Sequence, residues 1–253
     1  MLRALVLALA LASPVLAEET FVTGLSTEEI ALTANFSGSE LFVFGAIRRD
    51  APIDPAADPL DIVITIKGPP NALTVRRKER RFGIWINTES VDVRDAPSFY
   101  AIATTGPLRD LLTETERLRF QIGMDQAVRK VEGHPTIEDT SSFTEAVVRL
   151  REKQALYEVL DGGVSLAEET LFQTSIAMPA NIVEGIYKAE FFLVRDREVI
   201  SSTTTDITVQ KAGIERWIYN LSRQRPLFYG IMSVLVALLA GWLAAAAFRL
   251  IKR

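Results

Sequence analysis

The densest charged segment of the chain is residues 76–81, where five of six side chains are basic. The basic residues are Arg76, Arg77, Lys78, Arg80 and Arg81. Guanidinium and ammonium groups bind oxyanions, lipid headgroups and acidic protein surfaces through charge-assisted hydrogen bonds. Trp85 follows the run, and an aromatic side chain beside guanidinium groups suits a contact surface. The pattern predicts an anion or partner contact here, with a solvated strand end as the commoner alternative.

Two other groups have side chains suited to chemistry, but neither predicts a site. Four aspartates lie in or beside a proline-rich loop and supply the oxygen atoms that Ca²⁺ prefers: Asp50, Asp54, Asp58 and Asp61. Their spacing matches no calcium-binding loop, so we interpret them as part of a polar loop. His134 is the only histidine, and no nucleophile with an ordered partner lies near it in the sequence. We expect a structural or surface role for it.

The composition narrows the possible chemistry. The 253 residues include no cysteine, which excludes disulfides, thiolate zinc sites and cysteine nucleophiles. Asp and Glu outnumber Lys and Arg by 32 to 28, a formal net charge of −4, which argues against a nucleic-acid partner. We therefore expect no catalytic residues, no metal and no cofactor. A hydrolase that uses only carboxylates is an alternative, although the spacing singles out no pair.

Residues 1–17 have the pattern of a secretory signal peptide. Arg3 provides the positive start, residues 4–12 are apolar, and Val15 and Ala17 fit the positions that precede a cleavage site. The apolar run is too short to span a bilayer comfortably, so we expect cleavage rather than a retained anchor. The segment that follows is then exported.

A second apolar segment, residues 226–248, predicts a transmembrane helix. The 22 residues from Leu227 onward carry no charge and extend about 33 Å as a helix, enough to cross the hydrocarbon core. Arginines precede the span and basic residues follow it, so their count leaves the orientation undecided. Export of the N-terminal side predicts a single-pass protein with residues 18–225 outside the cell membrane and a short cytoplasmic tail at residues 249–253.

Two features of this anchor predict contacts. Residues 213–225 carry apolar side chains at helical spacing, which predicts an amphipathic helix that lies on the bilayer or packs against the soluble domain. Within the span, small residues recur every four positions: Ser233, Ala237, Gly241 and Ala245. Such a stripe lets another helix approach closely, although alanine-rich spans also produce one by chance.

Residues 18–212 have the pattern of a β-rich domain. Short runs of β-branched and aromatic residues alternate with Gly- and Pro-rich turns up to residue 104 and return after residue 170. Asp196-Arg197 predicts a tight connection between two such runs. The pattern is typical of a mainly β fold, an immunoglobulin-like antiparallel β-sandwich, here with one added C-terminal transmembrane helix.

Residues 107–162 interrupt this pattern with helical periodicity. Glu145 is placed to form a capping box with Ser142, and a stripe runs from Phe143 as far as Tyr157. Asp161-Gly162-Gly163 predicts the end of that helix. The segment is either a helical insertion in the sandwich or a separate subdomain.

Several short strings resemble a known family. They are Asn35-Phe36-x-Gly38, Phe44-Gly45-Ala46, Val75-Arg76-Arg77-Lys78, Gly83-Ile84-Trp85-Ile86-Asn87, Pro97-Ser98-Phe99-Tyr100, Pro179-Ala180-Asn181, Gly185-x-Tyr187, Phe228-Tyr229-Gly230 and Gly241-Trp242-Leu243-Ala244. Together they resemble the putative transmembrane protein family of Alphaproteobacteria over nearly the whole mature chain. The resemblance implies an inner-membrane protein with a periplasmic domain, found beside sulfite-exporter-type permeases. It implies no catalytic residues.

Two functions of different classes are consistent with these observations. The first is a membrane-anchored periplasmic module that docks on, or regulates, an inner-membrane permease or assembly factor through the sandwich surface and the small-residue stripe. The second is a periplasmic anion-binding or sensor domain that uses the basic run at residues 76–81.

Overall fold

The computed structural model describes residues 19–27, 29–32, 36–49, 58–128, 131–133, 141–211 and 214–251. Its contacts divide the chain into two units: residues 1–28 with 37–208, and residues 29–36 with 209–253. The described residues form mostly strands, which confirms the predicted mainly β class. The predicted signal peptide, Asp50, Asp54 and His134 lie outside the described residues.

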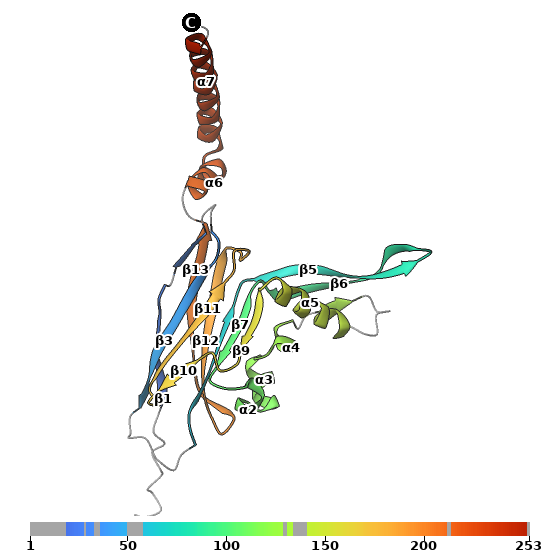
Figure 1. The fold of residues 1–253 in the computed structure, drawn as a ribbon, viewed down its shortest axis with the longest axis vertical. Coiled ribbons are helices and arrows are strands. Elements are labelled where there is room, and N and C mark those ends of the chain that lie inside the picture. The colour runs from blue at the N-terminus through green and yellow to red at the C-terminus, as the bar shows by residue number, and fades with distance from the viewer. Residues whose placement is uncertain are drawn as a thin grey trace, which may run out of the picture. The chain divides into compact units, whose positions relative to one another are not determined.

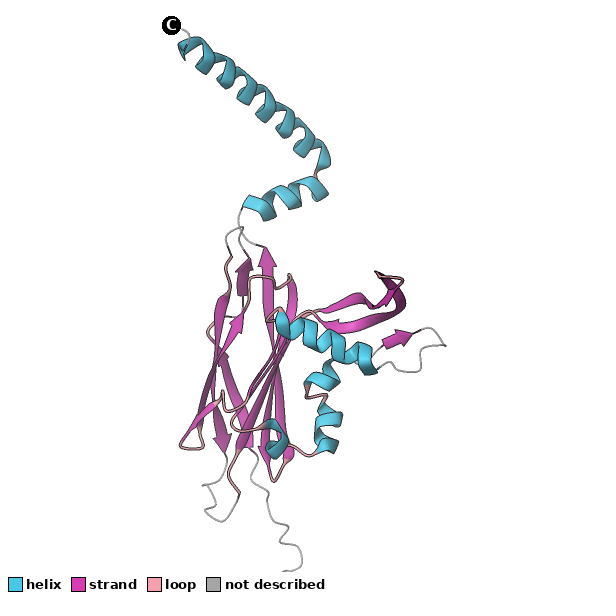
Figure 2. Cartoon of the chain, turned by 45° about the vertical axis from the view of Figure 1, so that its right-hand side comes forward, coloured by secondary structure: helices cyan, strands magenta, loops and turns pink. Residues whose placement is uncertain are grey.

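Two sheets pack face to face as a sandwich (Figures 1 and 2). The first sheet has the order β1 (Glu19–Leu25), β3 (Ser39–Arg49), β11 (Leu171–Met178), β10 (Ser165–Ala167). The second has the order β2 (Glu29–Leu32), β13 (Glu198–Lys211), β12 (Gly185–Arg195), β4 (Asp61–Lys67), β7 (Tyr100–Thr104), β9 (Tyr157–Leu160). The turn predicted at Asp196-Arg197 joins β12 to β13, and both of its residues have positive φ angles.

Aromatic side chains join the two sheets. The rings of Phe21 on β1 and Phe172 on β11 lie 5.7 Å apart, edge to face. Phe191 on β12 of the second sheet lies 6.1 Å from each of them. Aromatic pairs at these separations stabilise a core beyond the apolar area that they bury. This cluster therefore fixes the first sheet against the second.

Short helices cover the outer face of the second sheet. They are α2 (Leu108–Leu111), α3 (Glu114–Phe120), α4 (Met124–Ala127) and α5 (Ser141–Lys153). On α3, the Phe120 ring lies 5.4 Å from Phe192 on β12, and the Glu116 carboxylate accepts a hydrogen bond from the Val199 amide. With a cover on this side, residues 62–66 at the centre of β4 are all buried. This explains why β4 is almost continuously apolar rather than alternating.

The structure corrects the prediction for the end of this helical segment. Helix α5 ends at Lys153, not at residues 161–163, and Ala155 has a φ of 55°. The chain then forms strand β9, which pairs in parallel with β7, so the sandwich is not wholly antiparallel. Tyr157 is buried and donates a hydrogen bond to the Pro97 carbonyl, at 2.8 Å. Burial against a distant strand therefore overrides the helical spacing of this residue.

A third sheet stands apart from the sandwich. It contains β5 (Pro70–Arg81), β6 (Ile84–Pro97) and β8 (Val131–Gly133), all antiparallel. The β5–β6 hairpin, here called the arm, extends well beyond the body formed by the two main sheets (Figures 1 and 2). The arm carries the whole basic run.

The C-terminal helices form where the sequence predicts them. Helix α6 is Ile214–Gln224 and helix α7 is Pro226–Ile251, with Pro226 as the first residue of α7. Proline is favoured there because the first turn of a helix has no partner for its amides. Within the described residues, Pro226–Ala245 is long and apolar enough to cross a membrane. Its mean hydropathy is 2.1, and none of it is buried against the rest of the chain.

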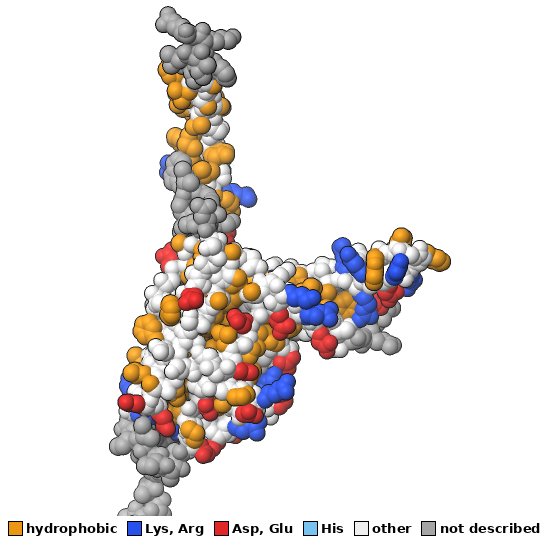
Figure 3. Space-filling view, in the orientation of Figure 1, with side chains coloured by type: hydrophobic (Ala, Val, Ile, Leu, Met, Phe, Trp, Pro, Cys, Tyr) orange, Lys and Arg blue, Asp and Glu red, His pale blue; other side chains and the backbone are white. Residues whose placement is uncertain are grey.

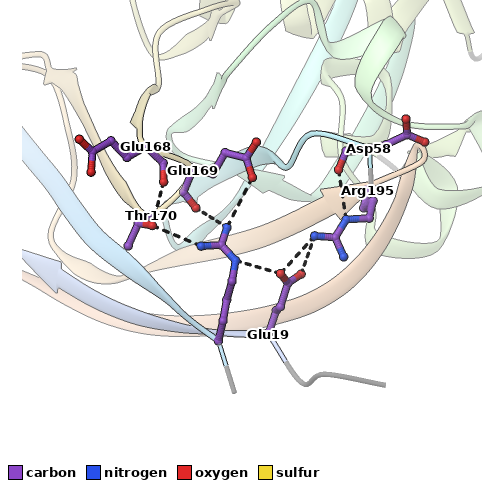
Figure 4. Close-up of polar contacts among 7 residues, drawn as sticks. Glu19, Asp58, Glu168, Glu169, Thr170 and Arg195 are labelled. Carbon is purple, nitrogen blue, oxygen red and sulfur yellow. Dashed lines mark hydrogen bonds and ion pairs between the residues drawn. The ribbon is translucent and has the colours of Figure 1, made fainter. Parts of the chain in front are cut away.

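A charged clamp closes one end of the sandwich (Figure 4). The Glu19 carboxylate on β1 pairs with Arg49 Nε at 3.0 Å and with Arg195 Nη2 at 3.0 Å. Arg49 belongs to β3 of the first sheet, and it also donates to the Glu169 carbonyl and to Thr170 Oγ1. Arg195 belongs to β12 of the second sheet, so the single carboxylate of Glu19 joins both sheets.

We predict that Glu19→Gln lowers the free energy of unfolding by about 2 kcal/mol, because it leaves the Arg195 guanidinium without its counter-charge and Arg49 with only the more distant Glu169 carboxylate, at 4.0 Å. Denaturant unfolding of the full chain in detergent micelles measures this loss. Glu114→Gln is the matched control, because Glu114 also pairs with an arginine at 2.9 Å but its side chain is 62% exposed. The control should change stability by no more than about 0.5 kcal/mol, and an equal effect of both variants would contradict the prediction.

Candidate interaction surfaces

Helix α5 supports the base of the arm. The Arg77 guanidinium pairs with Glu89 across the hairpin at 2.9 Å, donates to Ser142 Oγ at 2.5 Å, and lies 4.8 Å from the centre of the Phe143 ring. Val91 and Val93 of β6 are fully buried beneath the same region. Arg77 is therefore a structural residue that fixes the arm to the body. It is less available to a ligand than the other basic residues of the run.

The strand geometry divides the basic run between two faces. Side chains alternate along β5, and Arg77, Glu79 and Arg81 share one face. Three exposed residues share the other face and are here called the cationic row: Arg76, Lys78 and Arg80. None of these three forms an ion pair with any residue that the structure describes. The basic side chains visible on the arm in Figure 3 therefore do not converge on one point.

The far end of the arm is apolar and exposed. Arg81 lies opposite Ile84, so Phe82 and Gly83 form a two-residue turn, with φ angles of 52° and 85°. Phe82 is fully exposed, and Ile84 and Trp85 are 65% and 67% exposed. These three residues, Phe82, Ile84 and Trp85, are here called the apolar tip. Trp85 lies directly opposite Arg80 on the face of the cationic row.

A second apolar surface lies on the outer face of the first sheet. Val22, Phe42, Phe44 and Leu171 from three adjacent strands are all at least half exposed. A groove of about 630 Å³ runs across this face between β1 and β10. The Phe44 ring lies over Gly24 on this face, where a Cβ atom would approach a ring carbon to 2.8 Å. We call this surface the outer sheet face.

The small-residue stripe lies on helix α7 as predicted from its spacing. Gly241 has no side chain or other group within 4 Å of the position that a Cβ atom would take, and Ser233 donates to the Gly230 carbonyl at 2.8 Å. Ala237 and Ala245 complete the stripe and are exposed. The stripe is therefore open to a neighbouring helix, although no such helix is part of this chain's described residues.

The remaining polar groups form no candidate site. Among the described residues, no cluster of His, Asp and Glu is suited to hold a metal ion. Asp61 accepts a hydrogen bond from Thr105 at 2.6 Å. The pKa of the Asp196 carboxyl is raised because it shares a hydrogen bond with Asp58, but both residues are exposed at the surface. Burial raises the pKa of Tyr100, whose hydroxyl accepts a hydrogen bond from the Gly123 amide.

Comparison with known proteins identifies the family. The family model described as "Putative transmembrane protein (Alph_Pro_TM)" matches residues 20–250, which include both main sheets, the arm and almost all of α7. The chain belongs to the Alph_Pro_TM family. No curated protein matches it. Membership in this family, together with the apolar helix α7, makes it a membrane protein and confirms the resemblance seen in the sequence.

In this Alph_Pro_TM protein, sequence reasoning found part of the arm and missed the rest. It singled out the five basic residues and Trp85, but not Phe82 and Ile84. The signal was present, because Phe82-Gly83 separates two runs with β character and a two-residue loop places its residues at the apex of a hairpin. The outer sheet face was also missed, although residues 41–47 are apolar at both odd and even positions, which predicts apolar side chains on both faces of a strand.

The turn at the tip generates a prediction about stability. Two-residue turns with positive φ at both positions favour Asn-Gly, and phenylalanine is disfavoured at the first position. We predict that Phe82→Asn stabilises the arm locally by about 1 kcal/mol. Slower amide hydrogen exchange in β5 and β6 of the full chain measures the gain. Trp85→Asn is the control, because the backbone at Trp85 is an extended strand. Faster exchange in Phe82→Asn would show that the aromatic side chain itself stabilises the turn.

Proposed function

We propose that this protein is a single-pass protein of the bacterial inner membrane whose periplasmic β-sandwich is an accessory module for an integral membrane partner. The partner is a permease or an assembly factor, and a sulfite-exporter-type permease is the first candidate because of the family resemblance. The signal-peptide pattern of residues 1–17 supports export of the sandwich. In this topology α7 is the anchor and residues 249–253 are cytoplasmic.

The observation that carries this proposal is the outer sheet face. A soluble domain rarely exposes contiguous large apolar side chains from adjacent strands, and such patches usually mark protein–protein contacts. Here Phe42 and Phe44 of β3 lie beside Val22 of β1 and Leu171 of β11, and the Phe44 ring packs over Gly24. The polar groups lining this groove are few, which suits an apolar segment of a partner.

The stripe on α7 provides a second contact for the same kind of partner. Helices in a bilayer associate through close packing rather than through the hydrophobic effect, and small side chains permit that packing. The stripe and the outer sheet face are separate contacts, and each of them suits a partner that is an integral membrane protein. The proposal assigns no catalytic step to the chain.

Site-specific photo-crosslinking in native membranes tests the proposal. A photoreactive amino acid at position 44 or 171 should crosslink to one integral membrane protein, which mass spectrometry then identifies. The same probe at Ile200, which is 45% exposed on β13, is the matched control and should give no such product. In a chain with the probe at position 171, Phe44→Asp should reduce the product at least tenfold. Equal products from all positions, or none from 44 and 171, would contradict the proposal.

A second candidate function is anion sensing at the base of the arm. A hollow of about 390 Å³ lies between β5 and α5 and is lined by Arg76, Arg77, Lys78 and Arg149, with Glu145 also on its wall. Three of these cations belong to the basic run, and Arg149 adds a fourth from the helix. An oxyanion such as sulfite would fit this charge and size.

Thermal unfolding of the full chain with and without sulfite tests this candidate. At ten times the dissociation constant, binding stabilises a protein by about 1.4 kcal/mol, which should raise Tm by about 3–5 °C. Arg149→Gln should abolish the shift, whereas Arg109→Gln, which removes an exposed charge from α2, should leave it unchanged. An unchanged Tm at millimolar sulfite and phosphate would remove anion sensing as a function.

A further inference from the structure

The apolar tip is placed where neither folding nor solubility favours it. Phe82 has a φ of 52°, which is unfavourable for an aromatic residue, and its side chain has no contact that removes it from solvent. Ile84 and Trp85 extend the exposed apolar surface along the next two positions. Backbone strain that contributes nothing to packing is typical of sites that serve binding. The tip therefore requires an apolar environment outside this domain.

The cationic row indicates the charge of that environment. Arg76, Lys78 and Arg80 are alternate residues of one strand, so their Cα atoms are about 7 Å apart and the row spans about 13 Å. A single small oxyanion cannot contact all three, whereas a surface with repeated negative charges can. The row leads directly to Trp85 at the tip, and no described acidic residue pairs with it.

An anionic lipid surface offers repeated negative charge for the cationic row and an apolar layer for the tip. Its headgroups carry repeated negative charge, and the acyl region lies a few ångströms beneath them. Tryptophan and phenylalanine partition to that boundary, and arginine and lysine contact the headgroups while their stems cover apolar surface. An acidic protein would need an apolar pocket beside its acidic groups to match the arm equally well. The chain is anchored in a bilayer by α7, so lipid is always present at high effective concentration.

The geometry points to a lipid-binding arm. Phe82, Ile84 and Trp85 insert at the headgroup–acyl boundary of an anionic bilayer, and Arg76, Lys78 and Arg80 bind its headgroups. This function is separate from partner docking, because it uses the arm and not the outer sheet face or the stripe on α7. The two proposals therefore succeed or fail independently.

Vesicle co-sedimentation of the full chain tests the inference. The chain is first placed in nanodiscs of zwitterionic phosphatidylcholine. Helix α7 is then embedded in the nanodisc bilayer, so that only the exposed surfaces of the chain can bind added vesicles. These nanodiscs should co-sediment with vesicles that contain about 30% phosphatidylglycerol and not with vesicles of phosphatidylcholine alone. Raising the salt from about 0.1 M to about 1 M should release them, because it shortens the Debye length from about 10 Å to about 3 Å.

Variants separate the charge of the arm from the insertion of its tip. The triple variant R76Q/K78Q/R80Q should bind about 100-fold more weakly. The control R48Q/R109Q/K188Q removes three exposed cations from other surfaces, loses the same net charge, and should bind within about threefold of the parent chain. F82S/I84S should weaken binding at least tenfold with the row intact. It should also remove the blue shift of Trp85 fluorescence, measured in a chain that carries W217F and W242F.

Four outcomes would overturn the inference. The first is equal binding to anionic and zwitterionic vesicles, and the second is an equal loss in the row and control triple variants. The third is release by about 10 mM inorganic phosphate at constant ionic strength, which would assign the row to a free anion. A chain that ignores all vesicles but crosslinks through position 85 to an acidic protein would assign the arm to protein recognition instead. None of these results depends on crosslinking at positions 44 and 171, so the accessory-module proposal is tested separately.

Discussion

The rest of the structure depends on burial of both faces of the second sheet. The aromatic cluster of Phe21, Phe172 and Phe191 covers its inner face, and helices α2 to α5 cover the outer face beside β4 and β7. Because those helices must lie over the sheet, the chain leaves the sandwich after β7 and returns only at β9. The same helices include α5, which holds Arg77 and so fixes the base of the arm. The arm can project as a thin hairpin only because its base is fixed in this way.

The sequence predicts those parts of the fold in which local pattern and burial agree. Strand β11 alternates buried and exposed side chains at every position, as a strand with one buried face requires. The span of α7 is apolar on all sides, as a helix within a bilayer requires. The helix predicted for residues 154–160 does not form, because their local pattern conflicts with a distant contact. Tyr157 has the spacing of a helical stripe, but the free edge of β7 accepts a parallel strand there and buries the ring. No local signal in the sequence reports the edge of a strand more than fifty residues away.

The candidate surfaces show a related limit. Basic residues can be counted in a sequence, but the face that each occupies depends on the register of the hairpin. The pairing of Arg81 with Ile84 places Arg77 against α5 and leaves Arg76, Lys78 and Arg80 exposed. Trp85 lies in a strand, where most aromatic residues are buried, but its side chain is 67% exposed. Its exposure follows from the length of the arm, because β5 and β6 continue past the last point at which α5 or the sandwich can cover them.

The two apolar surfaces of this protein differ in a way that separates their partners. The outer sheet face spans three adjacent strands, has few polar groups in its lining, and contains a groove, which suits a protein segment of matching shape. The tip of the arm is narrow, has no groove, and is followed by cations with no ion-pair partner among the described residues. A convex tip of three side chains buries too little area to bind a protein tightly, but it can enter a fluid layer that adapts to its shape. The shapes of these surfaces therefore favour a protein partner at the sheet and a lipid surface at the arm.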